Sequence, residues 1–185
     1  MKGPIRWIAL GVGIVLVGFC VVAAVKLSKG TPEPSLPRLV QQHAPMPAFT
    51  LDGLDGKAIN SDQLKGKTVV VNFFNSWCMP CTQEAPALKA FYAEHKHDPD
   101  FAMVGIIIDD DAATMKPYVQ KESIGWPVGV DPHGEASLGF GTTGQPETYV
   151  FAPDGVAACG NLGASSQAAL DVWLHAAQTG QECTA

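Results

Sequence analysis

Two runs of consecutive apolar residues mark the centre of the predicted domain. Residues 68–74 read TVVVNFF and residues 101–108 read FAMVGIII. Strands that are apolar on both faces are typical of a buried parallel sheet, although Asn72 interrupts the first run. Shorter strand patterns are predicted at residues 48–51, 57–60, 126–130, 147–152 and 156–162. The turn sequences DGLDG at 52–56 and PDG at 153–155 predict two hairpins.

Segments with apolar residues at helical spacing lie between these strands. Residues 81–95 place Leu88, Phe91 and Tyr92 on one face of a helix. Further helices are predicted at residues 114–123, 135–140 and 165–178, and a single helical turn before Gly66. The helix at residues 114–123 is predicted to start late because Pro117 is tolerated only near the start of a helix. Strands joined by helices predict an α/β fold with a parallel core and an antiparallel hairpin at its end.

The N-terminus has a different pattern. Residues 7–25 contain no charged side chain and follow Lys2 and Arg6. About 20 apolar residues suffice to cross a bilayer, and preceding basic residues favour a cytoplasmic N-terminus. We therefore expect one transmembrane helix within a membrane anchor or signal segment, residues 1–29, with the rest outside the cytoplasm.

Two alternatives to a retained anchor stay open. Residues 22–24 form a weak signal-peptide cleavage site, although the apolar stretch is long for a signal peptide. Lipid attachment at Cys20 is disfavoured because Phe19 stands where a small residue is needed. The next segment, residues 30–47, is rich in proline and predicts an extended tether, which leaves residues 48–185 for one domain.

Charge excludes one class of function. The formal net charge of the chain is −6. All eighteen acidic side chains follow residue 30, against eight of the twelve basic ones, so the exported part carries −10. Nucleic-acid binding requires a basic footprint, and this sequence has none.

The sequence WCMPC at 77–81 carries the candidate chemistry. It places Cys78 and Cys81 where a buried strand leads into a helix, and a helix N-terminus stabilises a thiolate. Pro80 fits the first helical turn. Two residues between the cysteines allow them to form a disulfide with each other.

The remaining cysteines bear on a zinc alternative. A zinc site needs two further ligands at matching spacing, but Cys159 and Cys183 lie far apart, and the five histidines show no ligand pattern. His95 and His97 are predicted to lie at the solvated end of a helix. In an exported domain, Cys159 and Cys183 predict a structural disulfide that contributes about 3 kcal/mol. We expect no metal and no cofactor.

A second motif, GTTGQPETYVFAPDG at 141–155, makes the sequence signal much more specific than C-x-x-C alone. Together with WCMPC, LKGKTVVVNFF at 64–74, the leader and the additional β–α segment at 101–123, it resembles the TlpA/ResA-like branch of the thioredoxin superfamily. These proteins are membrane-anchored thiol–disulfide oxidoreductases with an AhpC/TSA-type redoxin domain. The resemblance implies a thioredoxin-like fold with an N-terminal β-hairpin and a central β–α insertion.

The resemblance also implies roles for individual residues. Cys78 would be the attacking, partly exposed cysteine and Cys81 the more buried resolving one. Pro146 would be a cis-proline beside them, and Glu84 would tune their ionisation. The substrate would contact the following residues: Trp77, Met79, Pro80 and Gln145.

One position departs from thioredoxin. Asn72 stands where thioredoxin has a buried aspartate, and an amide cannot act as a general base. Proton transfer to Cys81 would therefore fall to Glu84 or to water. A solvated, purely structural Glu84 stays open as an alternative.

The expected function is the reduction of protein disulfides at the outer face of the cell membrane, for example in apocytochrome c. The resemblance implies a membrane electron donor of the CcdA/DsbD kind. An oxidising, disulfide-forming role is one alternative, because the sequence does not set the redox potential. A non-catalytic thiol-binding module or metal chaperone is another, whereas a peroxidase is disfavoured by the surroundings of Cys78.

Overall fold

The computed structural model describes residues 13, 18–19, 37–41 and 43–183. Everything below concerns the compact unit Pro34–Ala185. Most of the predicted membrane span, Cys20 and the first part of the predicted tether lie outside the described residues. Among the described residues, no helix is both long and apolar enough to cross a membrane.

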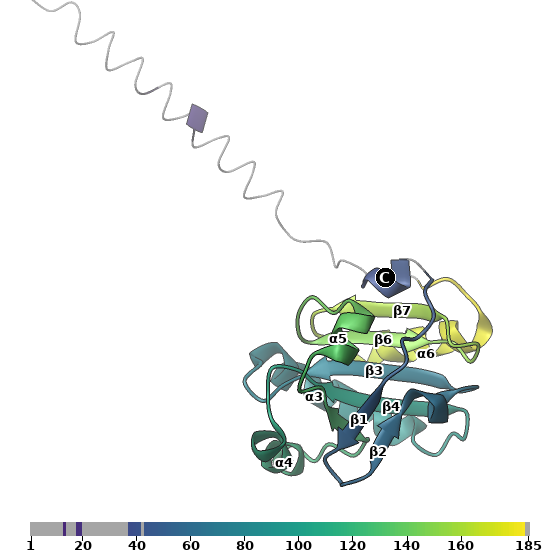
Figure 1. The fold of residues 1–185 in the computed structure, drawn as a ribbon. Helices are drawn as coiled ribbons and strands as arrows, with labels where there is room; N and C mark the ends of the chain where they lie inside the picture. The colour runs from purple at the N-terminus through teal and green to yellow at the C-terminus, as the bar shows by residue number, and fades with distance from the viewer. Residues whose placement is uncertain (1–12, 14–17, 20–36, 42, 184–185) are drawn as a thin grey trace, which may run out of the picture. The chain divides into compact units, whose positions relative to one another are not determined.

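A seven-stranded mixed sheet forms the centre of the domain (Figure 1), in the order β2-β1-β5-β4-β3-β6-β7. The strands are β1 Thr50–Gly53, β2 Ala58–Asn60, β3 Thr68–Phe74, β4 Phe101–Ile107, β5 Val128–Val130, β6 Glu147–Phe151 and β7 Ala157–Leu162. β3, β4 and β5 are parallel, as the two apolar runs predict, and the β6–β7 hairpin is antiparallel. β6 pairs antiparallel with β3, so β3 lies between its parallel neighbour and the hairpin.

Both faces of the sheet are covered, which is why β3 is apolar on both sides. Val70 and Phe74 pack in one core cluster with residues of α3 Met79–His95, α4 Ala112–Lys121 and α6 Gln167–Thr179. Val69, Val71 and Phe73 pack in a second cluster, on the side of α5 Glu135–Phe140. Alternate residues of β3 therefore face different helices.

Two helices differ from their predicted starts. α3 begins at Met79 with Cys78 as its N-cap, two residues earlier than predicted. α4 begins at Ala112, and the predicted start near Thr114 is wrong, because Asp111 caps the helix through the backbone N–H groups of Ala113 and Thr114. Pro117 consequently lies inside α4.

Part of the predicted tether packs on the domain. Residues 38–41 form the short helix α2 Arg38–Gln41, in which Val40 is buried. The following segment pairs with the start of β7: the Ala157 N–H donates to the Ala44 carbonyl at 2.9 Å, and Pro45 forms a bridge with Val156. The packed region thus begins before Ala48. Gly160 of β7 leaves room for this packing, because a Cβ at this position would lie only 3.1 Å from Val40.

Candidate active site

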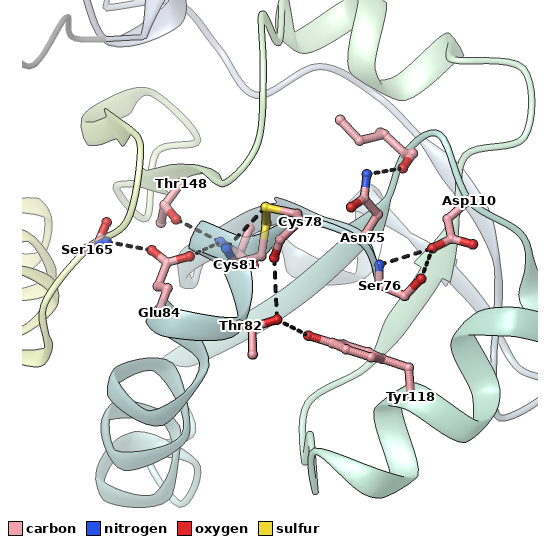
Figure 2. Close-up of a disulfide and its surroundings, with 12 residues drawn as sticks. Asn75, Ser76, Cys78, Cys81, Thr82, Glu84, Asp110, Tyr118, Thr148 and Ser165 are labelled. Carbon is pink, nitrogen blue, oxygen red and sulfur yellow. Dashed lines mark hydrogen bonds between the residues drawn. A yellow bond between two sulfur atoms is a disulfide. The ribbon is translucent and has the colours of Figure 1, made fainter. Parts of the chain in front are cut away.

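Cys78 and Cys81 lie where the carboxyl end of β3 leads into α3, and they form a disulfide with Cα atoms 5.2 Å apart. The Cys81 N–H donates to Cys78 Sγ at 3.1 Å (Figure 2). Each cysteine residue is 4% exposed. The expected difference in exposure is therefore absent from this disulfide form. The N–H at Cys78 Sγ supplies the stabilisation that a thiolate needs there.

The loop before the helix is held by residues that follow β4. Asp110 accepts hydrogen bonds from the Ser76 N–H at 3.0 Å and the Ser76 hydroxyl at 2.6 Å (Figure 2). Trp77 Nε1 donates to the Asp109 carbonyl at 3.1 Å. Partial burial opposes ionisation of Asp110, but the bonds from Ser76 and Asp111 hold its pKa below the usual value. This loop anchor was not predicted from the sequence.

A shallow groove borders the disulfide. Its lining comprises Trp77, Cys78, Met79, Pro80, Gly144 and Gln145. Trp77 is 63% exposed and Met79 69% exposed, which is unusual for large apolar side chains. The groove thus brings together the four residues that the resemblance assigns to substrate contact.

The Gln145–Pro146 peptide bond is cis. The buried carboxylate of Glu147 holds the loop that precedes it: Glu147 Oε2 accepts the Thr143 N–H at 2.9 Å, and Glu147 Oε1 accepts the Tyr149 hydroxyl at 2.5 Å. Burial and the contact with Glu147 raise the pKa of Tyr149. Sequence reasoning missed Glu147, although an acidic residue at the first position of a strand, directly after Pro146, was a usable signal.

Glu84 is buried, with only 2% of its surface exposed, so the solvated alternative is wrong. It lies one helical turn after Cys81, on the same face of α3. Its Oε1 accepts the Ser165 N–H at 2.8 Å, and its Oε2 accepts Asn72 Nδ2–H at 3.2 Å. Burial raises the pKa of Glu84 to about 7, against the opposing effect of hydrogen bonds from Ser165 and Asn72. A carboxyl with such a pKa can both take up and release a proton near neutral pH.

Cys159 and Cys183 form the second disulfide, with Cα atoms 5.7 Å apart. It joins β7 to the segment after α6.

The predicted solvated end of α3 is wrong for His95. Its side chain is 23% exposed and its ring packs on Phe91 with centroids 4.7 Å apart. His95 Nε2 lies 3.0 Å from Asp171 Oδ1 on α6. Atoms of Glu94, His95 and Asp171 that could bind a metal ion lie within 4.8 Å of one another. The hydrogen bond between His95 of α3 and Asp171 of α6 already explains why these side chains meet.

A comparison with protein families matches residues 40–158 to the AhpC/TSA family. Among curated relatives, "Thiol-disulfide oxidoreductase ResA" of Bacillus thuringiensis subsp. konkukian is 29% identical over 109 residues, which are 59% of this chain and 62% of that protein. "Thiol:disulfide interchange protein CycY" of Rhizobium leguminosarum is 33% identical over 116 residues, 61% of this chain and 59% of the relative. The match thus spans about three fifths of each relative.

Solved structures resemble about four fifths of this chain. A thiol:disulfide interchange protein of the thioredoxin family from Chlorobium tepidum has a TM-score of 0.66 and 28% identity, covering 80% of this chain and 99% of its own. A structure described as "MTB dsbF in its mixed oxidized and reduced forms" has a TM-score of 0.65 and 28% identity, covering 78% and 100%.

Proposed function

Because this chain belongs to the AhpC/TSA family and has a thioredoxin-like fold, we propose that it is a thiol–disulfide oxidoreductase. One observation carries the proposal: the Cys78–Cys81 pair stands at a helix N-terminus with the Cys81 N–H directed at Cys78 Sγ. The names of the ResA and CycY relatives support the same chemistry.

The proposed reaction begins with the reduced dithiol. The Cys78 thiolate attacks one sulfur of a substrate disulfide, forming a mixed disulfide and releasing the other substrate sulfur as a thiolate, which takes up a proton. Cys81 then loses its proton to Glu84 and attacks Cys78 Sγ. This attack releases the second substrate sulfur as a thiolate, which takes up a proton, so the substrate leaves as a dithiol. The two electrons that it gained came from the enzyme, which is left with the Cys78–Cys81 disulfide.

The groove beside the disulfide supports the proposed contact with substrate. Trp77 and Met79 offer exposed apolar surface beside the disulfide, and Gln145 lines the same groove. An extended protein segment with a disulfide suits such a surface, since its backbone can run along the loop before Pro146. Protein disulfides are therefore the proposed substrates.

We propose the reducing direction, at the outer face of the membrane, with the domain anchored by residues 1–29. The apolar N-terminal stretch, the basic residues before it and the acidic remainder of the chain support this location. Apocytochrome c is a proposed substrate, and a membrane protein of the CcdA/DsbD kind the proposed electron donor. Such a donor is required because an oxidising compartment does not regenerate the dithiol by itself.

Trapping tests the exchange reaction. Cys81→Ser leaves Cys78 free to attack but removes the resolving thiol, so the variant should accumulate mixed disulfides with substrate proteins, seen on non-reducing gels. Cys78→Ser is the matched control and should trap nothing. Failure of the wild type to reduce insulin, together with an empty trap, would leave a non-catalytic binding module as the better description.

The redox potential decides the direction. Equilibration of the Cys78–Cys81 pair with glutathione should place it near the value of thioredoxin, about −270 mV. A value near that of DsbA, about −120 mV, would instead support a disulfide-forming enzyme.

A further inference from the structure

Asn72 is a polar residue between the apolar Val70 and Phe74 on one face of β3. Its neighbours on that face, Val70 and Phe74, belong to the core cluster beneath α3 and α6. Asn72 itself is 1% exposed. A buried amide is costly unless its hydrogen-bonding groups have partners, so this position calls for an explanation.

The partners come from two other elements. Thr148 of β6 is the register partner of Asn72 across the β3–β6 pair, and its hydroxyl oxygen accepts from Asn72 Nδ2 at 2.9 Å. Glu84 of α3 accepts from the same nitrogen at 3.2 Å. An amide nitrogen has two hydrogens, and this geometry provides an acceptor for each.

The chemistry of residue 72 determines what Glu84 experiences. An aspartate at this position would place a second carboxylate about as close as the amide now lies, and two such groups cannot both ionise easily. A leucine would leave Glu84 Oε2 without this donor. An asparagine donates to the carboxylate and stabilises its charged form.

We propose that Asn72 is the positioning residue of Glu84: it holds the carboxyl group against the Cys81 face of α3 and favours its ionised form. The assignment of Glu84 as the proton acceptor for Cys81 rests on the proposed function, but the effect of Asn72 on Glu84 does not. Burial raises the pKa of Glu84, and hydrogen bonds from Ser165 and Asn72 oppose this rise. Cys81, which becomes a thiol when the disulfide is reduced, lies one turn away on the same helix.

Direct titration of Glu84 tests the proposal. The oxidised full-length protein is labelled with ¹³C at glutamate side chains, and the carboxyl signal absent from Glu84→Gln is followed by NMR from pH 4 to 10. We expect Asn72→Leu to raise the titration midpoint of Glu84 by at least about half a pH unit, because the lost amide hydrogen bond had favoured the ionised form. Thr148→Val removes the hydroxyl group that accepts from Asn72 but keeps the hydrogen bond between Asn72 and Glu84. It should therefore change the Glu84 midpoint less.

Asn72→Asp provides a second test if the leucine variant does not fold. Its new carboxyl should titrate together with Glu84 in two steps, the upper one above the wild-type midpoint. A Glu84 midpoint that stays at the wild-type value in the folded variants would overturn the proposal. The pH profile of insulin reduction should move in parallel with the midpoint. If insulin is not reduced at all but the midpoint moves, the proposed function fails while the role of Asn72 stands.

Discussion

At the scale of single residues, the active site combines two opposing influences on one carboxyl group. Burial of Glu84 favours its neutral form, whereas the Ser165 N–H and the Asn72 amide favour its charged form. The result is a pKa of about 7, close to the pH at which a proton must be exchanged. The acid–base group thus lies on the helix that carries the cysteines, and the strand beneath supplies its hydrogen-bond donor.

The raised pKa of Glu84 makes stability depend on pH. Below its ordinary pKa of 4.5 the group is protonated in both the folded and the unfolded states. Between that value and about 7 only the folded state holds the proton, so the free energy of unfolding falls as pH rises. The loss over this range amounts to about 3 kcal/mol.

Glu84→Gln should remove this contribution, because glutamine does not titrate. Denaturant unfolding of the oxidised protein at pH 5 and at pH 8 should show a smaller decrease for the variant than for the wild type. Surface glutamate Glu135→Gln is a suitable control and should retain the wild-type decrease. Parallel curves for Glu84→Gln and wild type would contradict the assigned protonation state.

At the scale of elements, α4 shows how a capping residue can outweigh a proline. Asp111 accepts hydrogen bonds from two backbone N–H groups of the first turn, which starts the helix at Ala112. Pro117 then has no hydrogen for the carbonyl of Ala113. Because Ala113 is exposed, water can bind this carbonyl, which limits the cost.

Pro117→Ala should therefore stabilise the protein, by about 1 kcal/mol. The gain from helix propensity and a restored hydrogen bond is about 3 kcal/mol, and it is reduced by the greater freedom of the unfolded chain and by the hydration already present. Guanidinium denaturation measures the difference. Lys116→Ala, at an exposed position of the same helix, should change stability by less than about 0.5 kcal/mol. A less stable Pro117→Ala would show that the proline makes contacts that the alanine cannot replace.

At the scale of the domain, the segments before β1 and after α6 are both tied to the β6–β7 hairpin. Residues before β1 pair with the turn of this hairpin through Pro45 and Ala44. The segment after α6 is joined to β7 by the Cys159–Cys183 disulfide, across 24 residues of sequence. The hairpin also pairs with β3, which leads into the active site.

Cys183→Ala should lower the free energy of unfolding by about 3 kcal/mol, because a loop of this length loses its covalent closure in the unfolded state. Insulin reduction well below the unfolding temperature should remain, since the active-site pair is intact. Peptide mapping of the wild type after mild reduction should still find Cys159 linked to Cys183. Two free thiols at these positions would refute the disulfide.

Much of the fold follows from local patterns. The run TVVVNFF predicts β3 with its observed bounds, because six of its seven residues are apolar or β-branched and such a run between turns fits a buried strand. The positions of Cys78 and Cys81 are also predicted locally, because a strand pattern precedes them and a helix pattern follows. Boundaries set by capping, such as that of α4, are less readable, because one side-chain hydrogen bond can override an unfavourable residue.

Other features depend on which residues the fold brings together. The sequence by itself determined the redox pair and the parallel strands beside it. It also determined that residue 72 is an asparagine, which cannot exchange a proton. The tertiary structure alone decided that Glu84 is buried, that it lies against Asn72 and Ser165, and that Glu147 holds the loop before Pro146. Residues 84 and 165 are 81 positions apart in the chain. Burial and hydrogen bonding across such a distance arise from packing, and it is packing that sets the pKa of a carboxyl group.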